Sequence, residues 1–175
     1  MHGEPPHRTR RAAEQAFLDT FNQIASCVTL ERVVLLEDPL RAVRGQLRFR
    51  ASGRARLNGD ADVWLDIRHV FETSQVAGGW VLASRAYHYH AYLGGQEIIA
   101  YHWHPGVTGF AAPHAHFKTL THPVALRNAH FPTGRISLEE IVRLLVRELH
   151  VMPRPGWERI LDRTEQHFAQ ARSWN

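Results

Sequence analysis

The chain has 175 residues, a length that predicts one domain large enough to bury a hydrophobic core. Its hydrophobic fraction of 44% is ordinary for a globular protein, and no apolar run approaches the roughly 20 residues that span a bilayer. The net charge is +4, and every basic side chain except Lys118 is an arginine, a bias that suits phosphate binding but also follows from genome base composition.

The N-terminal residues and the cysteine content predict the cellular compartment of the protein. The N-terminal residues carry basic side chains with no apolar segment behind them, so we expect no secretory signal. Cys27 is the only cysteine and cannot form a disulfide within the chain. We therefore expect a cytoplasmic protein with no membrane partner, built as a disordered arm over residues 1–9 and a single domain over residues 10–175.

Helical spacing of apolar residues appears near both ends of that domain. Residues 10–27 place Phe17 and Phe21 on one face of an amphipathic helix. Ser137 and Glu140 form a capping-box pattern in front of a second apolar stripe, which ends before Pro153. A last helix is expected from about residue 157.

The middle of the chain alternates between apolar and polar residues, as strands do. Glycine turn signals separate the runs, and their short spacing favours antiparallel hairpins. We predict an α+β fold in which an antiparallel sheet of about five strands has one N-terminal and two C-terminal helices packed on one face. The predicted strands lie at residues 28–36, 42–51, 62–72, 80–92 and 98–103.

Histidine is the most informative residue type in the chain. Eight of the thirteen histidines lie between His88 and His130, and six of those form three His-x-His pairs. In a strand, this spacing puts both rings of a pair on one face. Imidazole is the commonest metal ligand and the side chain whose ordinary pKa lies nearest neutrality, so the cluster predicts proton transfer or metal binding. The pairs are His88 with His90, His102 with His104, and His114 with His116.

The register of one hairpin decides whether the first two pairs can cooperate. A two-residue turn at Gly94-Gly95 would put His102 opposite Tyr87 and send the two pairs to opposite faces. A longer turn or a bulge would put His102 opposite His88 and gather both pairs on one face. The two glycines favour the two-residue turn.

The remaining histidines fit ordinary structural or surface roles. We expect His69, on an apolar strand face, to be a buried and hydrogen-bonded core residue. The others in this class are His2, His7, His122, His150 and His167.

A histidine-ligated metal site is one functional hypothesis, either cupin-like or hydrolytic. Three imidazoles with an open coordination position suit zinc or iron. A carboxylate partner is poorly placed in the sequence, because Glu97 follows the Gly-Gly turn and no acidic residue lies between Glu97 and Glu139. The candidate ligands are His88, His90, His102, His104, His114 and His116.

Metal-independent cleavage of RNA is the main hypothesis. Cleavage through the 2′-hydroxyl needs a base, an acid and a cation, which histidines and an arginine supply without a cofactor. The candidate catalytic residues are His90, His102, His104, His114, His116, His130 and Arg85.

An arginine-rich segment could hold the phosphate backbone of that RNA. No acidic residue interrupts residues 41–56, and alternation puts several of their guanidinium groups on one strand face. A solvated strand face explains the same pattern, and a non-catalytic module that binds nucleic acid or a partner protein is a third hypothesis. The candidate phosphate-binding residues are Arg44, Arg48, Arg50, Arg54 and Arg56.

Four short motifs resemble a known family. They are Tyr87-His88-Tyr89-His90, Tyr101-His102-Trp103-His104-Pro105, Pro113-His114-Ala115-His116 and His130-Phe131-Pro132 before a helix. Together they resemble the TumE-like toxins of bacterial toxin–antitoxin pairs, which are small basic α+β proteins with a histidine-rich hairpin. The resemblance covers residues 87–149 and implies a toxin that acts on RNA or translation and is neutralised by a helix-turn-helix antitoxin. A homodimer is a further open alternative.

Overall fold

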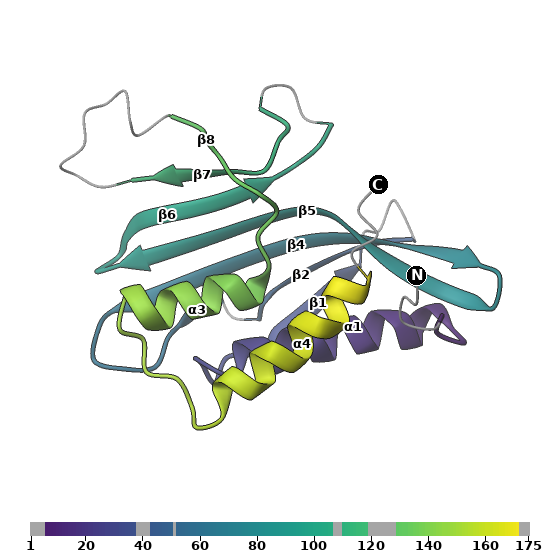
Figure 1. Ribbon diagram of the computed structural model, residues 1–175, viewed down its shortest axis with the longest axis horizontal. Helices are drawn as coiled ribbons and strands as arrows, with labels where there is room; N and C mark the ends of the chain where they lie inside the picture. Colours follow the sequence, from purple (N-terminus) through teal and green to yellow (C-terminus); the bar gives the residue numbers. More distant parts are fainter. Residues whose placement is uncertain (1–5, 38–42, 51, 107–109, 119–128, 172–175) are drawn as a thin grey trace.

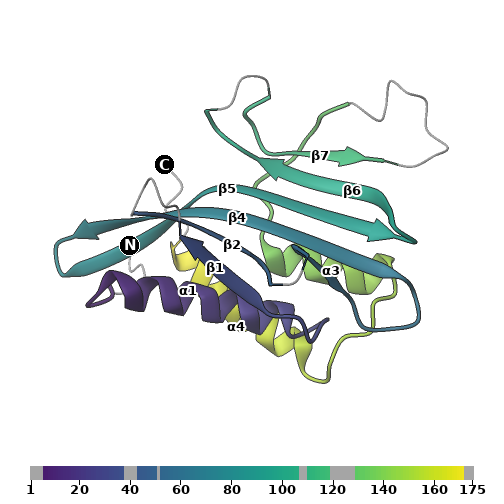
Figure 2. The same ribbon diagram turned by 180° about the vertical axis from the view of Figure 1, so that it is seen from behind.

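The computed structural model describes residues 6–37, 43–50, 52–106, 110–118 and 129–171. Within these ranges the protein is α+β, as predicted, with three helices and one antiparallel sheet of eight strands. The helices all lie on one side of the sheet (Figures 1 and 2).

The sheet order is β1-β2-β4-β5-β6-β7-β8, and the short β3 pairs with the remaining length of β4. Each strand runs antiparallel to its neighbour, so the sheet is built from consecutive hairpins and meanders. The strands are β1 (Val33–Glu37), β2 (Arg44–Phe49), β3 (Arg54–Arg56), β4 (Val63–Val76), β5 (Gly79–Leu93), β6 (Gln96–Trp103), β7 (His114–Phe117) and β8 (Phe131–Pro132).

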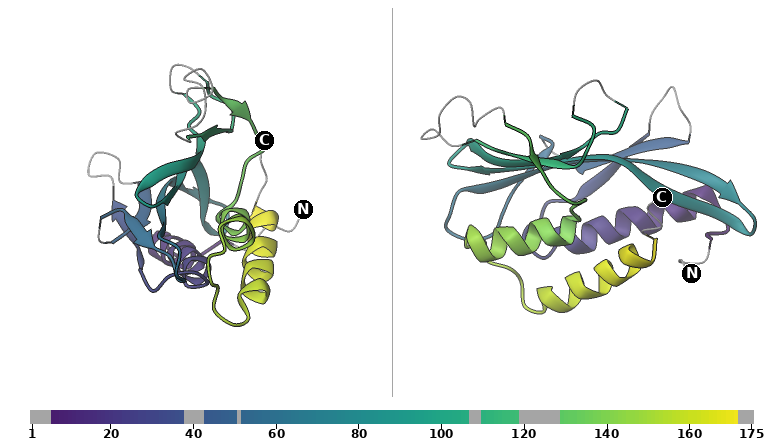
Figure 3. Two further views of the ribbon diagram at one scale, coloured as in Figure 1. Left: turned by 90° about the vertical axis from the view of Figure 1, so that its left-hand side faces the viewer. Right: turned by 45° about the horizontal axis from the view of Figure 1, so that its top comes forward.

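The helices begin where the sequence predicts them. Helix α1 (Arg10–Ala25) is capped by Thr9, whose side chain accepts a hydrogen bond from the backbone N–H of Ala12. Helix α3 (Leu138–Glu148) begins with the predicted capping box between Ser137 and Glu140. Helix α4 (Trp157–Ala171) completes a helical layer beneath the sheet, seen edge-on in Figure 3.

Strand alternation gives the sheet two chemically different faces. The helix face buries one side of β4 and β5, where Leu65, Ile67 and Tyr89 pack against Ile24 of α1 and Leu145 of α3. The opposite face, which we call the open face, carries the polar members of the same strands. Because no helix among the described residues lies over this face, its side chains are available for chemistry.

His69 is the buried, hydrogen-bonded core histidine that the sequence predicts. It is 2% exposed, and its two ring nitrogens lie 2.7 Å from the Tyr89 hydroxyl and 2.7 Å from the Ser84 hydroxyl. Burial lowers its pKa to about 3, so the ring is neutral and structural.

The predicted strand count is too low by three. The strands that the sequence did not predict are β3, β7 and β8, each four residues or fewer. Such short segments bury too few side chains for an alternation to stand out, and they exist because a longer neighbour supplies hydrogen-bond partners.

Residues 1–5 of the predicted arm lie outside the described residues. Farther along the arm, His7 pairs with Trp80 at the start of β5 through two backbone hydrogen bonds. Among the helices that the structure describes, each is too short or too polar to cross a lipid bilayer.

Candidate functional site

The hairpin between β5 and β6 combines the two register possibilities. Gly94 and Gly95 form a two-residue turn, with φ of 57° and 79°, and Leu93 pairs with Gln96. Two consecutive positive φ angles are the requirement of a type I′ turn, which glycine meets without strain. A bulge one step later leaves Ile98 as the extra residue, so that His88 pairs with His102. The preferred turn was predicted correctly, and the bulge, which the sequence left open as an alternative, puts the first two histidine pairs on one face.

Strand pairing now aligns the histidines in rows across the open face. One row runs Arg68, His88, His102, His114 and Pro132 over β4 to β8. The neighbouring row runs Arg54, Asp66, His90, Ala100 and His116 over β3 to β7. Residues directly opposite one another on neighbouring strands bring their side chains within contact range.

The result is a continuous band of imidazole rings, which we call the histidine ladder. Neighbouring ring centroids lie between 4.6 Å, for His116 and His130, and 6.4 Å, for His88 and His90. Other spacings include 4.9 Å for His90 and His102 and 4.8 Å for His114 and His130. The ladder brings together all the histidines predicted to be catalytic or metal-binding, namely His88, His90, His102, His104, His114, His116 and His130.

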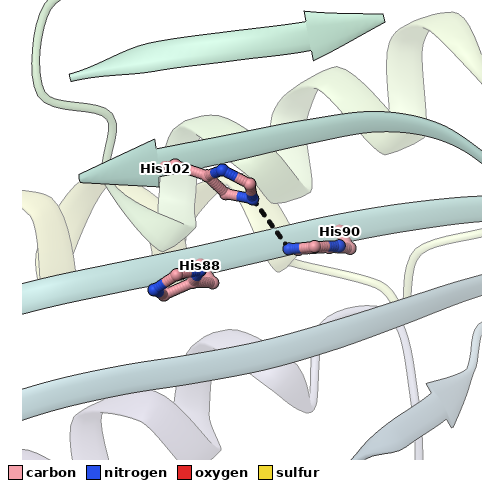
Figure 4. Close-up of side chains that lie close together, drawn as sticks. All are labelled: His88, His90 and His102. Atoms are coloured by element: carbon pink, nitrogen blue, oxygen red, sulfur yellow. Dashed lines mark hydrogen bonds between the residues drawn. The ribbon is translucent and has the colours of Figure 1, made fainter. Parts of the chain in front are cut away.

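His90 is held at one end of the ladder by a carboxylate. Its Nδ1 lies 3.0 Å from Oε2 of Glu97, and its Nε2 lies 2.9 Å from Nε2 of His102, the contact drawn in Figure 4. Burial alone would raise the pKa of Glu97, but hydrogen bonds from Lys118 and His90 outweigh burial and lower the pKa. Glu97 is therefore an ionised acceptor, so Nδ1 of His90 carries the hydrogen and Nε2 presents a lone pair.

His114 and His116 are oriented at the other end by backbone carbonyls. Nδ1 of His114 donates to the carbonyl of Ala112 at 2.7 Å, which leaves Nε2 as the nitrogen with the lone pair. That Nε2 is buried and has no hydrogen-bond partner among the described residues. His116 bonds the backbone of Ala129, beside His130.

The environment keeps the middle of the ladder uncharged. Burial, followed by the neighbouring Arg68 and histidines, lowers the pKa of His88 to about 4. Burial and the surrounding imidazoles lower the pKa of His102 to about 3. Burial also lowers the pKa of His114 and of His116. Neutral imidazole is the form that binds metals.

Three overlapping groups of ladder histidines have the geometry of metal ligands. In each group, one ring nitrogen from every member lies within 4.8 Å of the others. We call these groups the inner, middle and outer triads. They are His88, His90 and His102 (inner), His102, His104 and His114 (middle), and His114, His116 and His130 (outer).

The predicted phosphate-binding arginines lie on the strands beside the ladder, at different distances from it. Arg54 is nearest, because its guanidinium carbon sits 3.9 Å above the Tyr92 ring and its Nε lies 4.0 Å from Asp66, the cross-strand partner of His90. Arg56 pairs with Asp62 at 3.8 Å. The remaining three belong to β2, which like β3 pairs with β4, or to the residue after it: Arg44, Arg48 and Arg50.

An open hollow of about 530 Å³ lies over β2 and β4, and its lining includes Asp66 and Arg68, the cross-strand partners of His90 and His88. Arg48, Arg68, Gln46 and Asp66 supply most of its polar lining. Nε of Arg68 donates to Oε1 of Gln46 on β2 at 3.1 Å, and the Arg68 charge helps to lower the pKa of its cross-strand partner His88. The hollow thus offers two cations, of which Arg68 lies opposite a ladder histidine and Arg48 lies on the next strand.

Arg85, the predicted catalytic cation, has a different partner. It occupies the bulge of β5 opposite Val70 and Phe71, and its Nε donates to Oε2 of Glu72 at 2.8 Å. Its charge is therefore directed to a carboxylate on β4, and Arg68 is the arginine that the pairing puts opposite a ladder histidine.

Sequence reasoning missed three residues of this site. Glu97 was dismissed because of its distance along the chain, although the tight turn folds it back onto His90. Asp66 and Arg68 alternate with the apolar residues of β4, so the sequence did indicate that both side chains lie on the polar face of this strand. What the sequence did not reveal is that β4 pairs with the histidine strand in this register.

No protein-family model, curated protein or solved structure matches this chain. The resemblance to the TumE-like toxins therefore stays a prediction, and the function has to be argued from the site.

Proposed function

We propose that the protein binds a divalent transition-metal ion, zinc or iron, through the inner triad and uses it to hydrolyse an anionic substrate. The observation that carries this proposal is the convergence of ring nitrogens from His88, His90 and His102 within 4.8 Å of one another. A carboxylate–histidine pair, Glu97 with His90, supports it from outside the triad. Outer carboxylates of this kind fix the tautomer and raise the basicity of a ligating ring.

The ligand set fits zinc and iron in chemistry as well as in geometry. Three histidines leave a coordination position open, and zinc held in this way lowers the pKa of a bound water to about 7. The lowered pKa values of His88 and His102 keep both rings available as ligands at neutral pH.

The residues around the hollow suit an anionic substrate, in particular a phosphate ester. Arg48 and Arg68 can each donate a forked pair of hydrogen bonds to phosphate oxygens. Asp66 lines the same hollow opposite His90, and burial raises the pKa of its carboxyl group. A carboxylate whose pKa is raised is a stronger base, which suits Asp66 to accept a proton from the attacking water.

Metal-independent RNA cleavage by a TumE-like toxin is the second candidate function. The contact that favours it is the 2.9 Å separation of the Nε2 atoms of His90 and His102, across which one ring donates a proton to the other. In this proposal the ladder supplies base and acid, the arginines hold the RNA, and a helix-turn-helix antitoxin neutralises the activity. It ranks second because a pKa near 3 makes His102 a poor proton donor or acceptor at neutral pH.

One experiment separates the two candidates. Purified protein is assayed for bound zinc and iron by elemental analysis, and for cleavage of a labelled RNA with and without excess chelator. The metal proposal predicts that His102→Ala loses one equivalent of bound ion, and that chelation abolishes the activity and zinc restores it. RNA cleavage that persists in excess chelator and is lost in His102→Ala would overturn the metal proposal and favour the toxin proposal. His150→Asn, at an exposed position after α3, is the matched histidine control.

A further inference from the structure

We propose that the outer triad, His114, His116 and His130, is a second metal site that binds its own divalent ion independently of the inner triad. Its three ring nitrogens lie within 4.8 Å of one another. This inference goes beyond the proposed hydrolytic site, because it concerns different residues at the other end of the ladder.

Membership of the triads determines how many ions the ladder can hold. The inner and outer triads share no residue, so both can be filled at once. The middle triad borrows His102 from the inner triad and His114 from the outer one, so an ion there would take a ligand from each. The arrangement therefore favours two ions at the ends, with His104 left between them.

His114, which belongs to the outer and the middle triads, supports an ion beside it independently of the spacing. Its side chain is 1% exposed, its Nδ1 donates to the Ala112 carbonyl, and its buried Nε2 has no hydrogen-bond partner among the described residues. A polar atom buried without a partner is costly, and an ion at this position would satisfy it. The Ala112 carbonyl orients the His114 ring through Nδ1, as Glu97 orients the His90 ring.

The surroundings of the outer triad differ from those of the inner one. Phe110 packs against His114 and His130, with ring centroids 5.1 Å and 5.3 Å apart. This apolar ring packs beside the outer triad, whereas the inner triad has Asp66 and Arg68 of the arginine-lined hollow as cross-strand neighbours. An ion at the outer triad would join β7 to the segment that enters β8, so we assign it a structural role.

A titration of the metal-free full chain with zinc tests the second site. Isothermal calorimetry should show two equivalents for the wild type, one for His130→Ala, one for His90→Ala and none for the double variant. His130 is exposed, so its replacement should leave the far-ultraviolet circular dichroism of the chain unchanged. The control variant His150→Asn should keep both equivalents.

The outcomes separate this site from the hydrolytic one. If His90→Ala loses an equivalent and His130→Ala keeps the wild-type number, the second site is refuted and the inner site stands. If only His130→Ala loses an equivalent, the inner site falls instead. A single equivalent in the wild type that His104→Ala abolishes would place one ion at the middle triad and overturn both.

Discussion

Nδ1 of His90 donates a hydrogen bond across 3.0 Å to Oε2 of Glu97, a residue on the next strand of the sheet. The other carboxylate oxygen of Glu97 lies 2.7 Å from Nζ of Lys118, the single lysine of the chain. Glu97 is therefore fixed from both sides, and in turn it fixes which nitrogen of His90 faces His102 and His88.

Replacing Glu97 with glutamine tests whether this contact tunes a metal ligand. Glu97→Gln keeps the size of the side chain but removes the negative charge that orients and polarises His90. We expect zinc affinity to fall by about 10–100-fold, the usual effect of losing an outer-shell partner. Competition against a chelator of known affinity measures the loss. Glu148→Gln, at an exposed position of α3, is the control, and equal affinities in the two variants would rule out this role for Glu97.

The arginines of the hollow should govern the binding of anionic substrates. Arg48→Ala and Arg68→Ala each remove one cation from the hollow, so single-stranded RNA should bind more weakly. The slope of log affinity against log salt should become shallower by about 0.7 per arginine that contacts a phosphate. Fluorescence anisotropy over a salt series gives both quantities. Arg147→Ala, on the helical side of the molecule, should behave as the wild type. Slopes unchanged in all three variants would remove phosphate binding from the hollow.

The stability of the metal-free protein should depend on pH through His69. The folded-state pKa of this residue is about 3, and its ordinary value is 6.5, so the unfolded chain binds the extra proton first as the pH falls. The contribution of neutral His69 to the free energy of unfolding is complete above pH 6.5 and is lost progressively as the pH drops toward 3. A pKa difference of this size corresponds to a few kcal/mol, on the order of 1.4 kcal/mol per pH unit.

Urea unfolding of the wild type and of His69→Gln measures this effect. The variant should lose about 1–3 kcal/mol at neutral pH, because Tyr89 and Ser84 lose a well-placed partner. Its unfolding free energy should then fall less steeply in acid than that of the wild type. Parallel pH curves would show that the pKa of His69 is the same in the folded and the unfolded chain, contrary to its burial.

Local signals allowed much of the fold to be predicted from the sequence. The capping box at Ser137 and the alternation along β4 depend on neighbouring residues, so the pattern and the structure agree. The short strands β3, β7 and β8 depend on partners elsewhere in the chain and were missed.

The candidate site shows the same division between local and long-range information. The His-x-His spacing correctly predicted that the pairs in β5 and β7 each share a strand face, because that is a property of one strand, whereas His104 lies one residue beyond the end of β6. The bulge at Ile98 was not predictable in this way, since it reflects how β5 and β6 best bury their apolar residues together. That bulge decides whether His88 meets His102, and with it whether the inner triad exists.

X-ray absorption at the zinc edge of the zinc-loaded protein tests the metal proposal most directly. We predict a first shell dominated by imidazole nitrogens at about 2.0–2.1 Å, which changes when His90 or His102 is replaced by alanine. A shell of oxygen atoms alone, or a spectrum identical in the wild type and both variants, would contradict a metal site at His88, His90 and His102.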